Sequence, residues 1–326
     1  MNQQPVLEIK DLKTHFFTYA GVVKAVDGIN LHLNQNEVLG IVGETGCGKS
    51  VTARSILKLV PQPGKIVAGE IILNGKNILS MSDSETNEIR GGQVAMIFQN
   101  PLSSLNPLFT IGEQASHIIR IHQNLKQVAA RERAVEMFNQ VRLPNPNRLL
   151  NKYPHELSGG QLQRIMIAMA LSCLPQLLIA DEPTTALDVT IQAQILTLML
   201  QLKEETKTSI MLITHDLGVV AEVCDRVVIM YAGRIMEDAP VEDIFQEPLH
   251  PYTKGLMASI PGRNEEGQEL AAITGSVPNL ITPPSGCRFH PRCPHAEEIC
   301  QQKTPALKTH KDGHNIACFL YDKEGQ

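Results

Sequence analysis

The segment GIVGETGCGKSVTA, residues 40–53, joins an apolar run to a glycine-rich loop that ends in a lysine and a serine. It matches the pattern G-x-x-x-x-G-K-[ST] at Gly43, Gly48, Lys49 and Ser50. The glycines let the backbone curl so that successive N–H groups point inward, and these donors hold phosphate oxygens together with the positive end of the following helix. A chance glycine-rich turn is the alternative, but the position between a buried strand and a helix favours a triphosphate-binding loop.

The chemistry of this loop predicts which groups hold the nucleotide. Lys49 places a point charge on the β- and γ-phosphates, and the Ser50 hydroxyl is a suitable ligand for Mg²⁺. Cys47 takes a variable position of the pattern, so its thiol is expected to make the activity that depends on this loop sensitive to alkylation. The residues expected to contact the nucleotide are Gly43, Glu44, Thr45, Gly46, Cys47, Gly48, Lys49, Ser50 and Val51.

A second motif, LLIADEPTTALD at residues 177–188, ends an apolar run with two acids. Asp181 is predicted at the C-terminal tip of a buried strand, the edge where ligands bind in open α/β sheets. There it can hold Mg²⁺ through the water shell of the ion, and Glu182 can polarise the attacking water as a general base. Paired acids often only begin a solvated turn, but the phosphate loop favours the catalytic interpretation.

Length and composition limit the possible classes of protein. The 326 residues suit one large domain with an appendage, and the net charge of −5 gives no strong basic field, so no nucleic-acid partner is expected. No run of about 18 apolar residues occurs, and the start MNQQPVLEIKDLK lacks the features of a signal peptide. We therefore expect a cytosolic protein that reaches a membrane only through a partner.

Apolar runs alternate with helical patterns along most of the chain. VLGIVG, VAMIFQ, LLIADEP and SIMLITHD are predicted as buried strands, and a long helix at about 189–207 separates the last two. This β-α-β alternation predicts an α/β fold with a parallel sheet and helices on both faces. GEIILNGKNIL is expected to form a hairpin with a turn at Asn74 and Gly75.

The same patterns predict how the chain is divided. Residues 110 to about 150 are helical in period and more polar, as in an inserted helical subdomain at about 100–165. After about residue 248 the composition shifts, and residues 261–286 are rich in Gly, Pro, Asn and Ser. We therefore predict a main domain at 1–255 and a C-terminal extension at 256–326.

LSGGQLQR, residues 157–164, lies between the two sites. Together with the phosphate loop and the ADEP acids, it resembles the signature of ABC transporter ATPases over about residues 6–250. The resemblance implies a P-loop NTPase core with an N-terminal antiparallel β-subdomain and a helical insert that carries the signature. Gln99 matches the Q-loop of that family, TALD with Asp188 its D-loop, and His215 in LITHD its switch histidine.

In that family the signature meets the γ-phosphate bound to the opposite subunit. The resemblance assigns this contact to Ser158, Gly159 and Gly160, with the helix from about Gln161 pointing its N-terminus at the anion. A motif that reaches across a dimer explains why one chain carries two phosphate-contacting loops. The alternative is a turn followed by an ordinary helix N-cap.

Further contacts follow from the same resemblance. His215 would hydrogen-bond the γ-phosphate, although a lone histidine after a strand is more often structural. Gln99 would touch Mg²⁺ or water, and the loop QNPLSSLNPLF that it begins would sense the membrane partner; a proline-rich connector is the alternative. An aromatic residue near the N-terminus should stack on adenine, and Phe16 is favoured over Phe17 and Tyr19, with a core role as the alternative.

The segments AMIFQNPLSSLNP, HPYTKGLMASIP and GCRFHPRCPHAEEIC resemble the ATP-binding subunits of dipeptide/oligopeptide importers. This implies an ATPase heterodimer on the cytoplasmic face of the membrane, beneath two permease subunits that are served by an extracytoplasmic binding protein. The ATP-binding subunits of nickel, glutathione or oligosaccharide importers share many of these sequence segments, so these importers remain as alternatives. A non-transport ABC ATPase and a metal-sensing module built on the C-terminal residues are more distant alternatives.

Four of the seven cysteines crowd the C-terminus, with the spacing Cys287-x5-Cys293-x6-Cys300-x17-Cys318. Four thiolates can hold a [4Fe–4S] cluster or a tetrahedral Zn²⁺. Zinc sites favour C-x2-4-C pairs, and none occurs here, so the spacing favours the cluster. The resemblance implies the same cofactor, while zinc and an unmetallated site remain as alternatives.

Overall fold

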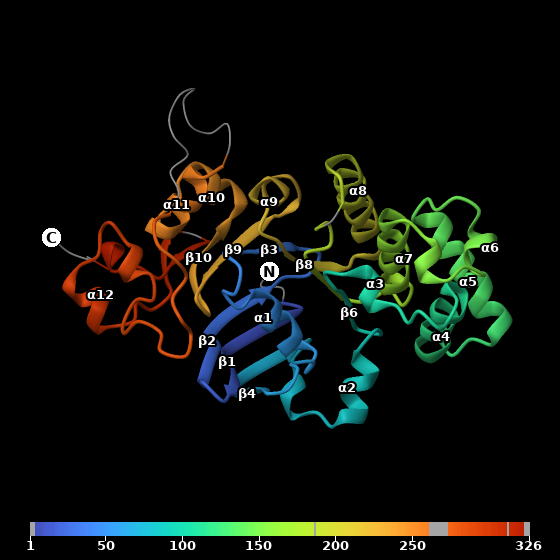
Figure 1. Ribbon diagram of the computed structural model, residues 1–326, viewed down its shortest axis with the longest axis horizontal. Helices are drawn as coiled ribbons and strands as arrows, with labels where there is room; N and C mark the ends of the chain where they lie inside the picture. Colours follow the sequence, from blue (N-terminus) through green and yellow to red (C-terminus); the bar gives the residue numbers. More distant parts are fainter. Residues whose placement is uncertain (1–3, 186, 261–272, 312, 323–326) are drawn as a thin grey trace. The chain divides into compact units, whose positions relative to one another are not determined.

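The computed structural model describes residues 4–185, 187–260, 273–311 and 313–322 (Figure 1). The chain forms two compact units. The first unit consists of the residues up to 6, together with 34–36 and 80–213. The second unit consists of 7–33, 37–79 and the residues after 213. The second unit therefore combines the start of the chain with its end.

The first unit is built on a parallel sheet. β7 (Leu177–Asp181) lies between β6 (Val94–Ile97) and β8 (Ser209–Ile213), and all residues of β7 and β8 are buried. Because both faces of these strands are covered, their sequences are continuous apolar runs, as predicted for a parallel sheet. The helices are α2 (Asp83–Ile89), α3 (Pro101–Ser104), α4 (Ile111–Gln123), α5 (Gln127–Gln140), α6 (Pro146–Leu149), α7 (Gly159–Leu171) and α8 (Val189–Thr206).

The helical insert of the first unit begins with a strong local signal. Thr110 caps α4, because its side chain accepts from the Glu113 N–H while the Glu113 carboxylate accepts from the Thr110 N–H. α4 then buries Ile111, Ala115 and Ile119, which are spaced one turn apart on one face. α4, α5 and α6 gather together in Figure 1. The predicted helical insert is confirmed.

The second unit contains an antiparallel sheet near its N-terminus. Its strands, in the order β2-β1-β4-β5, are β2 (Gly21–Leu33), β1 (Leu7–Thr18), β4 (Gly64–Leu73) and β5 (Lys76–Asn77). Leu73 pairs with Lys76 across the turn Asn74–Gly75, where both residues have positive φ (47° and 78°). The predicted hairpin is confirmed, since a turn with positive φ at both central residues matches the twist of the two strands.

The second unit also contains a sheet in which the two ends of the chain meet. β3 (Val38–Val42) pairs in parallel with β9 (Arg226–Tyr231), and β10 (Arg234–Pro240), β12 (His314–Ile316) and β11 (Lys308–Lys311) follow as antiparallel neighbours. The C-terminal residues thus extend the sheet that carries the phosphate loop. The helices are α1 (Lys49–Ile56), α9 (Leu217–Val223), α10 (Val241–Gln246), α11 (Pro251–Ala258) and α12 (Glu298–Gln302).

The α/β fold class with its antiparallel β-subdomain is confirmed. The predicted boundary between 255 and 256 falls inside α11, and residues 261–272 of the Gly- and Pro-rich segment lie outside the described residues. Among the helices that the structure describes, none has both the length and the apolar composition to cross a membrane.

Candidate functional site

The glycines of the phosphate loop are required by close backbone contacts. A Cβ atom at Gly43 would lie 2.1 Å from the Met230 carbonyl oxygen, and one at Gly48 would lie 2.4 Å from the Ala25 oxygen. Gly48 also has φ 108°, a conformation that other residues rarely adopt. The glycines therefore let the loop run directly from β3 into the N-terminus of α1, where a phosphate site is expected.

Lys49 begins α1 and is 6% exposed. Its Nζ donates to the Gly43 oxygen at 2.6 Å and to the Glu44 oxygen at 3.2 Å. These bonds hold the ammonium inside the curl of the loop, where a phosphate would need a counter-charge.

Two residues that the sequence did not single out hold the loop from outside. The Arg292 guanidinium donates to both Glu44 carboxylate oxygens, at 2.7 Å and 3.1 Å, and the Tyr252 hydroxyl accepts from the Glu44 N–H at 3.0 Å. The hydrogen bond to Glu44 raises the pKa of Arg292, and burial raises the pKa of Tyr252. Tyr252 belongs to the HPYTKG segment and Arg292 precedes Cys293, but neither motif indicates a contact with the loop.

Cys47 is fully buried. Burial raises the pKa of its thiol, and this outweighs the opposite influence of Lys49. A buried thiol with few thiolate anions reacts slowly with alkylating reagents, so the structure argues against the expected sensitivity.

The two acids of the ADEP motif follow β7 in the first unit. Asp181 ends the strand and is 3% exposed, whereas Glu182 is half-buried and has a left-handed backbone with φ 48°. Such a conformation costs free energy in a non-glycine residue and is common at functional sites. The Glu182 carboxylate accepts from Gln99 Nε2 at 2.8 Å and from Thr185 Oγ1 at 3.0 Å. Because β6 and β7 are parallel neighbours, their C-terminal ends bring Gln99 to Glu182.

The signature begins α7 with a capping box. The Ser158 side chain accepts from the Gln161 N–H, and the Gln161 side chain accepts from the Ser158 N–H. Ser158 and Gly159 are exposed, while a Cβ at Gly160 would lie 3.3 Å from Ile191. The N-terminus of α7 is therefore open to a ligand, and it is also an ordinary N-cap, so the geometry fits both interpretations.

The remaining predicted residues divide between the units. Asp188, in the first unit, caps α8 by accepting from the Ile191 N–H at 2.9 Å. His215, in the second unit, is exposed, and the preceding Thr214 donates its N–H to the Ile41 oxygen of β3 at 3.2 Å. This bond places His215 next to the strand that leads into the phosphate loop.

The three aromatic candidates lie at the end of the β1–β2 hairpin. Phe16 is half-buried and pairs with Val23, Phe17 is 46% exposed, and Tyr19 is fully exposed. A Cβ at Gly64 would lie 2.7 Å from the Phe16 ring, so this ring lies against β4. These contacts do not select one ring for adenine, and Phe16 stays a prediction.

The four C-terminal cysteines line a single small cavity. The Cys287 N–H donates to the Cys300 oxygen at 2.8 Å, which joins two of the segments that carry them. Burial raises the pKa of Cys287 and Cys293, and it raises the pKa of Cys318 to about 12. Within the described part of the chain, no group of three or more His, Cys, Asp or Glu side chains is arranged to hold a metal ion.

Comparisons with known proteins agree with these motifs. Residues 26–185 match the family described as ABC transporter, and residues 236–300 match the family described as oligopeptide/dipeptide transporter, C-terminal region. The oligopeptide transport ATP-binding protein AppD of Bacillus subtilis is 52% identical over 98% of each chain. OppD of Salmonella typhimurium is 49% identical over 96% of this chain and 93% of its own length.

A solved structure adds a likeness of fold. It is a dimeric, post-hydrolysis state of an ATP-binding cassette bound to ADP and Pi. The two chains are 27% identical, and the TM-score is 0.65 over 72% of this chain and 98% of the other.

Proposed function

The chain belongs to the ATP-binding proteins of ABC transporters, and from this premise we propose that it powers the import of dipeptides or oligopeptides by hydrolysing ATP. The observation that carries the proposal is the match of residues 236–300 to the C-terminal region of peptide transporters, on the same chain as the ATPase motifs. Relatives named for oligopeptide and dipeptide transport support the same substrate class.

We assign the phosphates to residues 43–51, with Lys49 against the β- and γ-phosphates and Phe16 against adenine. Mg²⁺ bound with the nucleotide would neutralise the phosphate oxygens, and the Ser50 hydroxyl, the Asp181 carboxylate and the Gln99 amide are oxygen donors of the type it prefers. Glu182 accepts a proton from the water that attacks the γ-phosphorus. The bond between the γ-phosphorus and the oxygen that bridges it to the β-phosphorus breaks. The products are ADP and inorganic phosphate.

His215 would donate to the γ-phosphate, and Ser158, Gly159 and Gly160 would close over the nucleotide of the other subunit. Gln161 and Asp188 belong to the same closing surface. Binding of two nucleotides then draws the ATPase pair together, and hydrolysis lets it open. The left-handed backbone of Glu182 and its bond to Gln99 support a carboxylate held in place before the nucleotide arrives.

We propose a second ATPase subunit as the partner, with two membrane permeases and an extracytoplasmic binding protein completing the complex. The segment after Gln99 supports a docking role, because Leu102, Leu108 and Phe109 are 53%, 81% and 50% exposed. Apolar side chains gathered on a short loop are typical of an interaction site. The protein would then act at the cytoplasmic face of the membrane, attached through its permeases.

We further propose that Cys287, Cys293, Cys300 and Cys318 hold a [4Fe–4S] cluster. All four cysteines line one small cavity, which supports a four-thiolate site. They are not arranged around a single ion, and a cluster of four irons holds its thiolates farther apart than one Zn²⁺ does. Protein purified without oxygen is expected to be brown, with about four irons per chain.

The cluster proposal has a matched control. Cys293→Ser should lose iron and colour, whereas Cys173→Ser, at a half-buried cysteine in the first unit, should keep both. A colourless protein that contains zinc would exclude the cluster.

The transport proposal is tested on the complex assembled with its permeases in vesicles. Peptide-loaded binding protein should stimulate ATP hydrolysis and drive uptake of the peptide. Glu182→Gln should still bind ATP but lower hydrolysis about 100- to 1000-fold and abolish uptake, because the base is lost. Glu205→Gln, at an exposed position on α8, is the control.

Stimulation by nickel or glutathione instead of peptide would assign the chain to another importer. Normal hydrolysis by Glu182→Gln would show that a different residue acts as the base.

A further inference from the structure

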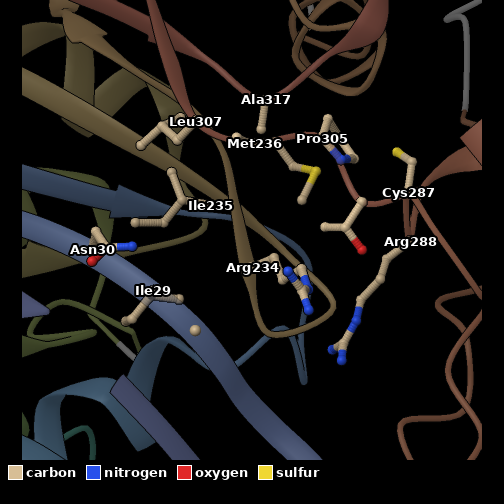
Figure 2. Close-up of a pocket in the computed structure, with 13 residues that line it drawn as sticks. Ile29, Asn30, Arg234, Ile235, Met236, Cys287, Arg288, Pro305, Leu307 and Ala317 are labelled. Atoms are coloured by element: carbon tan, nitrogen blue, oxygen red, sulfur yellow. The ribbon is translucent and has the colours of Figure 1, made fainter. Parts of the chain in front are cut away.

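A cavity of about 400 Å³ in the second unit has no role in the proposed ATPase cycle (Figure 2). It lies among β2, β10 and the C-terminal residues, and its volume is typical of small-molecule sites. One side is largely apolar and carries Ile29, Ile235 and Leu307, with the Asn30 amide beside Ile29, whereas the other side carries Arg234 and Arg288.

The charged side of the cavity has more cations than anions. Arg234 and Arg288 both donate to the same oxygen of Asp27, at 3.0 Å and 2.5 Å. His15 lies 3.7 Å from the other Asp27 oxygen and brings no negative charge. Two guanidinium groups therefore share a single carboxylate, and an anion entering the cavity would balance the second positive charge.

The two arginines also differ in the hydrogen-bond partners of their guanidinium N–H groups. Arg288 is 3% exposed and donates to the Ala232 oxygen as well as to Asp27. Arg234 is 29% exposed on its side chain, and its buried Nε has no hydrogen-bond partner among the described residues. The exposed part of Arg234 lines the cavity, so its Nη groups, rather than the enclosed Nε, can donate to a ligand.

We propose that this cavity binds a small monocarboxylate with an apolar body. The carboxylate would meet Arg234 beside Arg288, because the guanidinium fork matches a carboxylate with two parallel hydrogen bonds. The body of the ligand would lie along Ile29, Ile235 and Leu307 and remove apolar surface from water.

The cavity is linked to the phosphate loop by one turn. Arg288 donates to the oxygen of Ala232, and the next residue, Gly233, donates its N–H to the Cys47 oxygen at 2.8 Å. Asp27, the shared carboxylate, donates its own N–H to the Gly233 oxygen at 2.9 Å. A ligand that draws the arginines away from Asp27 would therefore alter the support of the loop and change the KM for ATP.

The test measures binding of hexanoate to the full-length protein by calorimetry. Hexanoate should bind at least about tenfold more tightly than hexanol, which lacks the charge, or than acetate and inorganic phosphate, which lack the apolar body. Equal affinity for any of these three probes, or no binding of hexanoate, would overturn the amphipathic site.

Two variants test the residues. Arg234→Met should weaken hexanoate binding at least about tenfold, while Arg133→Met, which removes an arginine of similar exposure (27%) that also pairs with one carboxylate, should not. Leu307→Trp fills the apolar side without removing a charge and should also block binding. Unchanged binding in both cavity variants would overturn the assignment.

ATP hydrolysis by the same proteins tests the link to the phosphate loop. Hexanoate should change the KM for ATP about threefold or more in the wild type and leave Arg234→Met unaffected. An unchanged KM with bound hexanoate would retain the site and overturn the link.

Discussion

The phosphate loop and the C-terminal segment from Cys287 to Cys293 lie in the same unit but owe their conformations to different causes. The loop can be recognised from its own residues, because glycines stand where a Cβ would strike a carbonyl oxygen of a neighbouring segment. The segment is held by distant partners, since Arg288 bonds to Asp27 and Arg292 bonds to Glu44. A local motif can be recognised from the sequence, whereas the anchoring of the segment cannot.

The two regions meet at Glu44, a position that the loop pattern leaves free. This contact makes the C-terminal residues a support for the loop. Variants of the loop should therefore lower ATP hydrolysis directly, whereas variants of the C-terminal segment should act by weakening its contacts with the loop.

The largest expected effect comes from the loop itself. Lys49→Ala removes the buried ammonium that faces the phosphates and should lower hydrolysis on the order of 1000-fold. Lys76→Ala, at an exposed lysine on β5, is the control for charge alone. ATPase assays decide the point, and unchanged hydrolysis in Lys49→Ala would remove the basis of the phosphate-loop assignment.

The support should respond to pH through His250, which is buried among the aromatic rings that hold Phe289. Burial lowers the pKa of His250 to about 4, so the unfolded chain binds one more proton between pH 6.5 and 4. The neutral His250 therefore contributes fully to the free energy of unfolding above pH 6.5. This contribution, up to about 3 kcal/mol, is lost as the pH falls to 4.

Chemical unfolding at several pH values measures this loss. His250→Asn keeps an acceptor for the Tyr252 N–H but does not titrate, so it should reduce the slope in that window, where the lowered pKa values of His32 and His122 account for a remainder. His155→Asn, at an exposed histidine, should not. Asp27 and Glu237 have lowered pKa values, so the stability that they contribute is lost only as the pH falls below their unfolded pKa values, near 4. An equal slope in the wild type and His250→Asn would assign the pH dependence to other groups.

A smaller effect is expected where the two regions touch. Arg292→Met leaves Glu44 without its guanidinium and should raise the KM for ATP about fivefold, with a smaller change in kcat. Arg292→Lys should recover part of the loss, and a double-mutant cycle with Glu44→Gln should show coupling. If the KM stays constant in all three variants, the ion pair stabilises the fold without positioning the loop.

The smallest effect should be at Cys47. Its buried thiol should react with iodoacetamide at pH 7 at least about tenfold more slowly than a free cysteine, and ATPase activity should persist. Cys47→Ser then serves to identify the modified site by mass spectrometry. Rapid inactivation of the wild type, absent in Cys47→Ser, would show that the loop opens more than the structure indicates.

The sequence by itself determined the phosphate loop, the Asn74–Gly75 hairpin, the helical insert and the parallel strands, because each depends on residues that are close together in the chain. Only the tertiary structure decided that Arg292 holds Glu44, that Gln99 meets Glu182 and that four spaced cysteines face one cavity. Side chains such as these are brought together by strand order and by the return of the C-terminal residues to the sheet. The steric need for glycine leaves a pattern in the residues of the loop, whereas the pairing of side chains that lie far apart in the chain leaves almost none in one sequence.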